Sequence, residues 1–86
     1  MFNIIERYME RITKDDINNF AIKKDIILSE EELNFTYNFV KKNYKNILSN
    51  PKLLDLNRYQ NNYTKENFSK ITKVYQEYSQ RYSNYL

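Results

Sequence analysis

Apolar residues recur every three or four positions along most of the chain, which is the spacing of one face of an α-helix. Residues 2–12 follow this spacing and predict a first helix with one apolar side. That side would carry Ile4, Ile5, Tyr8 and Ile12. No two segments show the alternating pattern of paired strands, so the sequence predicts an all-α fold.

Polar residues that commonly begin helices interrupt the apolar pattern. Thr13, followed closely by two aspartates, predicts an N-cap and a second helix that runs to about Lys23. Ser29 and Glu32 have the spacing of a capping box and predict the start of a third helix. Residues 26–28 lie between these two helices, and their β-branched pair suggests a short extended connector.

The third predicted helix ends near Asn46 and carries two adjacent apolar stripes. The first stripe consists of Leu33, Tyr37, Val40 and Tyr44, and the second consists of Phe35 and Phe39. An apolar arc of this width can contact two neighbouring helices, so we expect this helix at the centre of the fold. The predicted core residues are Leu33, Phe39, Val40, Leu54 and Phe68.

The second half of the chain predicts a short helix followed by a long one. Pro51 suits the first position of a short fourth helix, which would present three leucines and end before Asn61. Thr64 opens the last predicted helix, and no helix-breaking residue follows it before Leu86. Because the chain has no internal repeat and no linker, residues 1–86 predict a single domain. We expect a compact bundle of about five helices, three of them short, with a longer C-terminal helix.

The composition excludes several kinds of chemistry. The 86 residues include no cysteine, no histidine and no glycine, so they offer no disulfide, no catalytic thiol or imidazole, and no glycine-rich phosphate loop. The acidic clusters at 15–16 and 30–32 lie at predicted helix starts, where they complement the helix dipole. We therefore expect no enzymatic activity, no cofactor and no metal site.

The hydropathy of the chain also bears on its location. The longest apolar run covers only residues 26–28, whereas a membrane span needs about 20 apolar residues. Glu6 interrupts the N-terminal stretch where a secretion signal would need apolar residues. We therefore expect a cytoplasmic protein with no membrane partner.

The order of these local signals resembles a known family. A capped helix at 12–17 is followed by a connector that ends at Ser29, a basic helix end at 41–47, and a helix opening at 63–66. This order is similar to that of a family of small helical proteins of unknown function, of about this length, from low-GC Gram-positive bacteria. The resemblance implies a cytoplasmic helical fold and supplies no activity and no site residues.

Basic residues concentrate in the second part of the chain. The net charge is +3 overall, but residues 34–86 carry nine Lys and Arg against three acidic residues. Five lysines could form a patch on the third and last helices, with tyrosines interleaved: Lys41, Lys42, Lys45, Lys70 and Lys73. Such a surface suits phosphate contacts and base stacking, so weak nucleic-acid binding is the alternative function.

An aromatic stripe on the last helix is the sharpest functional signal. Its members follow the three- and four-residue spacing of a heptad seam: Phe68, Ile71, Tyr75, Tyr78, Tyr82 and Tyr85. The inner half suits a core, whereas each outer tyrosine has a hydroxyl that must reach water or a partner. We therefore expect a protein-interaction module, adaptor or regulatory, that binds an unidentified protein or a second copy through Tyr78, Tyr82 and Tyr85.

Overall fold

The computed structural model of the protein describes residues 2–50 and 54–83. These ranges contain four α-helices and one 3-10 helix, and no strand. In chain order they are α1 (Phe2–Glu10), α2 (Lys14–Lys23), α3 (Glu30–Ser49), η2 (Leu56–Asn62) and α4 (Lys65–Ser83). The predicted all-α fold is confirmed.

The helices α2 and α3 begin at the predicted residues. The Thr13 side chain accepts a hydrogen bond from the Asp16 N–H at 3.1 Å, and the Asp16 carboxylate accepts one from the Thr13 N–H at 3.0 Å. Ser29 and Glu32 make the same reciprocal pair at 3.1 and 2.8 Å. Both capping boxes therefore satisfy backbone donors that the first helical turn leaves unpaired.

The end of α2 is a Schellman turn built without glycine. Asp25 takes a left-handed conformation with φ of 62°, which aspartate tolerates better than most residues. The Ile26 N–H donates to the Ala21 carbonyl at 2.8 Å, and the Asp25 N–H donates to the Ile22 carbonyl at 3.0 Å. Ile26 and Ala21 are both buried, which supplies the apolar contact that usually accompanies this turn.

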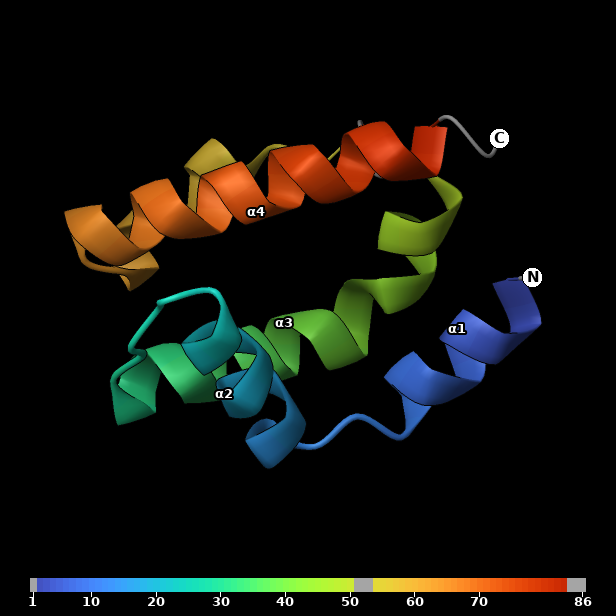
Figure 1. Ribbon diagram of the computed structural model, residues 1–86, viewed down its shortest axis with the longest axis horizontal. Coiled ribbons are helices and arrows are strands. Elements are labelled where there is room, and N and C mark those ends of the chain that lie inside the picture. The colour runs from blue at the N-terminus through green and yellow to red at the C-terminus, as the bar shows by residue number, and fades with distance from the viewer. Residues whose placement is uncertain (1, 51–53, 84–86) are drawn as a thin grey trace.

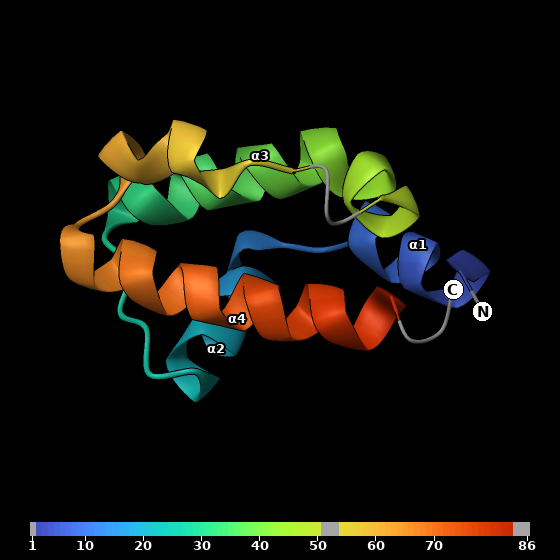
Figure 2. The same cartoon turned by 90° about the horizontal axis from the view of Figure 1, so that it is seen from above.

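The helix α3 packs against both α1 and α2, in agreement with the two neighbours that its wide apolar arc predicts. Figure 1 shows α4 running along the top of the molecule above α2 and α3, and the view from above places it between them (Figure 2). The buried apolar residues of the described chain are Ile12, Ile17, Ala21, Ile26 and Leu48. Ile17 and Ala21 belong to α2, Ile12 and Ile26 lie just before and just after that helix, and Leu48 lies in the last turn of α3.

The predicted core differs from this set. Leu33, Phe39, Val40, Leu54 and Phe68 are half-buried rather than buried. A domain of this size buries only about 60% of its chain surface, and several of its aromatic residues are half-buried. Ring contacts with centroids 4.8 to 6.1 Å apart join one cluster of them: Phe35, Phe39, Tyr59 and Tyr63.

The apolar side predicted for the first helix is wrong at two positions. Ile4 is 77% exposed and Tyr8 is 58% exposed. The side that is at least half-buried carries Ile5 and Met9 and continues to Ile12, which is buried. These three residues are also spaced by three and four, so periodicity alone could not choose between two overlapping stripes.

Two boundaries in the middle of the chain also differ from the prediction. The helix α3 continues to Ser49, beyond Asn46, and the short helix is the 3-10 helix η2. It runs through Asn61 and Asn62, where the prediction ended it. Pro51 and Leu53, which were expected in the first turn, lie outside the described residues.

Candidate functional site

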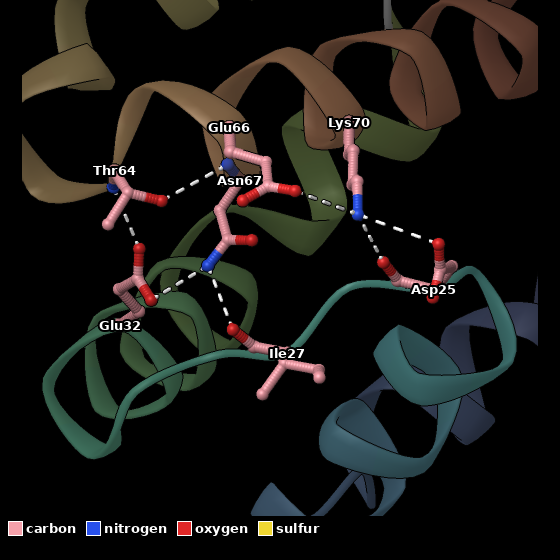
Figure 3. A network of polar contacts seen from close by, with 7 residues as sticks. All are labelled: Asp25, Ile27, Glu32, Thr64, Glu66, Asn67 and Lys70. Carbon is pink, nitrogen blue, oxygen red and sulfur yellow. Dashed lines mark hydrogen bonds and ion pairs between the residues drawn. The ribbon is translucent and has the colours of Figure 1, made fainter.

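A network of polar contacts fixes the first two turns of α4 to the rest of the molecule (Figure 3). We call this network the polar anchor, and it links α4 to the end of α2, to the connector and to the start of α3. Its side chains and backbone groups come from six residues: Asp25, Ile27, Glu32, Thr64, Asn67 and Lys70.

Glu32 is the centre of the polar anchor. One carboxylate oxygen accepts hydrogen bonds from the Ser29 N–H at 2.8 Å and from the Asn67 amide at 3.0 Å. The other oxygen accepts a hydrogen bond from the Thr64 N–H at 2.9 Å. Thr64 directly precedes α4, so a single carboxylate accepts a backbone donor at the start of each of two helices.

These hydrogen bonds keep Glu32 ionised although the residue is only 5% exposed. Burial by itself raises the pKa of Glu32, but the hydrogen bonds from Ser29, Thr64 and Asn67 outweigh it and lower the pKa below its ordinary value. No lysine or arginine of the described chain forms an ion pair with this carboxylate. Its charge is therefore balanced by backbone and amide dipoles.

Asn67 and Lys70 complete the polar anchor. The side-chain amide of the buried Asn67 also donates to the Ile27 carbonyl at 2.9 Å. The backbone N–H of Asn67 donates to the Thr64 hydroxyl at 3.1 Å. The Lys70 ammonium donates to the Asp25 carbonyl at 2.8 Å and lies 3.6 Å from its carboxylate. Glu66, one turn before Lys70, provides a second carboxylate at 3.5 Å. A positive charge therefore lies at the C-terminal end of α2, where the helix dipole favours it.

The five lysines of the predicted basic patch fall into two groups: two have a partner within the protein and three are exposed. Lys41 donates to the Glu10 carbonyl at the end of α1, and Lys70 belongs to the polar anchor. Lys42, Lys45 and Lys73 are exposed. The two lysines with intramolecular partners reach the ends of different helices, α1 and α2, so they do not converge on one site.

Exposure increases along the aromatic stripe of α4. Phe68, Ile71 and Tyr75 are half-buried, and burial raises the pKa of Tyr75. Tyr78 is 44% exposed. Tyr82 belongs to α4, but its side chain and the whole of Tyr85 lie outside the described residues.

The residues of the polar anchor were only partly predictable. The capping-box spacing predicts the contact between Glu32 and Ser29, and it is confirmed. The contacts of Glu32 with Thr64 and Asn67 span 32 and 35 positions, and no local pattern marks them. The exposed pair Ile4 and Tyr8 was also missed, because it was counted as part of the buried side.

The residues that the structure describes offer no candidate metal site. They hold no group of three or more acidic, histidine or cysteine side chains that could bind a metal ion. Within the same residues, no helix is both long and apolar enough to cross a membrane. Comparison of the chain with protein-family models, with curated protein sequences and with solved structures finds no match.

Proposed function

We propose that this protein is a small interaction module that binds a helical partner through the outer half of α4. The contact residues are Tyr78, Tyr82 and Tyr85, of which the structure describes the side chain of Tyr78. The observation that carries the proposal is the change along the stripe. Its first three members are half-buried, whereas Tyr78, five residues before the end of α4, is exposed.

Tyrosine suits such a contact for a physical reason. Its ring provides a large apolar area with little rotamer entropy to lose, while its hydroxyl can form a hydrogen bond at the edge of the contact. The heptad spacing of the stripe is the spacing that packs one helix against another. We further propose that the protein is not an enzyme, that it acts in the cytoplasm, and that it belongs with the small helical family that its sequence resembles.

Nucleic-acid binding is the competing function, and it depends on different residues. Lys42, Lys45 and Lys73 are exposed and could contact phosphates. Lys41 and Lys70 would first have to leave the carbonyl groups of Glu10 and Asp25, which weakens the alternative. The two functions also differ in salt dependence, because phosphate contacts release counterions whereas apolar contacts do not.

A capture experiment separates the two functions. The wild-type protein, the double variant Tyr78→Gln/Tyr82→Gln and the control Gln76→Ala would be immobilised and exposed to lysate of the source cells. Gln76 is exposed on the same helix and lies outside the stripe. We expect wild type and control to retain the same protein, and the double variant to lose it.

The salt series gives the second readout of the same experiment. Protein bound through tyrosines should stay bound as the salt concentration rises from about 0.1 to 1 M, because screening acts on charges. Binding that falls with a log–log slope of roughly −4 to −5, the value for about five phosphate contacts, would instead support the lysine surface. Retention that is equal for wild type and the double variant would contradict the proposed function.

A further inference from the structure

The described chain consists of two parts, each of which packs within itself. In the first part, residues 2–50, the helices α1 and α2 both pack against α3. In the second part, residues 54–83, α4 packs against η2. Figure 1 shows α4 along the top of the molecule, with α1 and α2 below it. We call the two parts the α1–α3 unit and the η2–α4 unit.

The two units differ in what they bury. The buried apolar residues of the described chain all belong to the α1–α3 unit: Ile12, Ile17, Ala21, Ile26 and Leu48. The described residue that the η2–α4 unit buries is Asn67, which is polar. Burial of apolar surface is the main favourable term in folding, so the α1–α3 unit holds the larger share of the stabilising core.

Polar contacts and half-buried rings join the two units. The polar anchor provides hydrogen bonds from Thr64, Asn67 and Lys70 to the α1–α3 unit. The hydroxyl groups of Thr36 and Tyr63 form one more. The four rings of the aromatic cluster, which connects α3 with η2 and the residue after it, are half-buried. Hydrogen bonds at such a junction are exchanged for bonds to water when it opens, so their net contribution is modest.

We propose that the η2–α4 unit opens away from the α1–α3 unit while the α1–α3 unit stays folded. Proteins open in cooperative units, and the units with few buried apolar contacts open at the lowest free energy. Opening would uncover the inner half of the aromatic stripe, Phe68, Ile71 and Tyr75, which is half-buried in the closed form. A partner helix could then contact the whole stripe, and only this consequence rests on the proposed function.

Asn67 ties the η2–α4 unit to two segments of the other unit. Its side-chain amide donates to the Glu32 carboxylate at 3.0 Å and to the Ile27 carbonyl at 2.9 Å. Alanine at this position removes a donor from the buried carboxylate of the closed form. Water hydrates that carboxylate once the units separate, so the substitution favours opening.

Hydrogen exchange of the full-length protein tests the opening, with NMR detection and a series of urea concentrations below the unfolding transition. The amides of the inner half of α4, residues 69–75, should share one opening equilibrium. This opening should be at least about tenfold more populated than the one that exposes the central amides of α3, residues 37–46. Its urea dependence should be weaker, because opening one unit exposes less surface than global unfolding. Equal populations and equal urea dependences for α3 and α4 would show a single cooperative unit and would overturn the proposal.

Two pairs of variants distinguish opening of the whole unit from fraying at the end of α4. Asn67→Ala should speed the exchange of the inner α4 amides about tenfold or more, whereas Gln76→Ala, at an exposed position of α4, should not. If Asn67→Ala does not fold, Lys70→Met and the exposed Lys73→Met form a milder pair with the same expected order. Fraying from the C-terminal end would leave these amides insensitive to Asn67→Ala and to Lys70→Met, and this result would also contradict the proposal.

Failure of this inference and failure of the proposed function give different results. Tyr78 is exposed in the closed form, so capture that depends on Tyr78 does not require opening. A single cooperative unit in hydrogen exchange would overturn the opening and leave the adaptor function standing. Loss of the capture, with the expected exchange pattern, would contradict the adaptor function alone.

Discussion

The carboxylate of Glu32 and the backbone N–H of Thr64 are joined by a hydrogen bond of 2.9 Å. This bond connects the first turn of α3 to the residue that precedes α4, although 32 positions separate the two residues. The same carboxylate closes the capping box of α3 with Ser29. The start of the helix that carries the proposed contact surface therefore depends on one buried acidic side chain.

The substitution Glu32→Gln should destabilise the fold by about 1 to 3 kcal/mol at neutral pH. Glutamine keeps the shape of the side chain but replaces one acceptor oxygen with an NH2 group. One of the three donors that now face the carboxylate would therefore lose its acceptor. Chemical denaturation measures the free energy of unfolding, and Glu31→Gln is the control because Glu31 is exposed in the same helical turn.

The destabilisation by Glu32→Gln should depend on pH. The pKa of Glu32 is lowered in the folded protein, so the stability from this group is present above the ordinary glutamate pKa of 4.5. It is lost as the pH falls through the lowered pKa of the folded state. The difference between wild type and variant should therefore be largest at neutral pH and shrink in acid, and a constant difference would contradict this role.

The fold was more predictable from the sequence than the site was. Caps at Thr13 and Ser29 are local, since each depends on residues three positions apart, and both were predicted correctly. The polar anchor depends on the tertiary arrangement. Nothing in the local sequence of Asn67 indicates that its amide meets Glu32 and the Ile27 carbonyl.

The substitution Lys70→Met should cost about 1 kcal/mol. It keeps the aliphatic stem and removes the hydrogen bond from the ammonium to the Asp25 carbonyl. The ion pairs with Asp25 and Glu66 add little because both carboxylates are well exposed. The cost should therefore persist at about 1 M salt, and Lys73→Met, at an exposed position of the same helix, should be nearly neutral.

The left-handed residue Asp25 allows a backbone test of the turn after α2. The substitution Asp25→Ala should destabilise by about 1 kcal/mol, because alanine keeps the Cβ that is crowded against the backbone at positive φ but loses the short polar side chain that makes this conformation tolerable for aspartate. Asp25→Gly should be neutral or stabilising, since glycine has no such clash. Both variants lose the carboxylate, so an equal loss of stability in thermal melts would assign the effect to the ion pair with Lys70 instead.

Periodicity could not resolve which side of a helix faces solvent when two apolar stripes overlap. On α1, the stripe with Ile4 and Tyr8 and the stripe with Ile5 and Met9 have equal spacing, and only packing against α3 distinguishes them. On α4 a single stripe is present, and the sequence predicted a change from core to surface along it. The half-buried Phe68 and the exposed Tyr78 agree with that change.

The measurement that tests the central claim most directly is the melting temperature of Tyr78→Gln/Tyr82→Gln, at a protein concentration too low for association. If the outer tyrosines form a contact surface, the change in stability should stay within about 0.5 kcal/mol, or about 2 to 4 °C. The comparison is Phe68→Ala, in the half-buried part of the same stripe, which should melt roughly 10 °C lower. A double variant that melts as low as Phe68→Ala would show that the outer tyrosines belong to the core, and the proposed interaction surface would be contradicted.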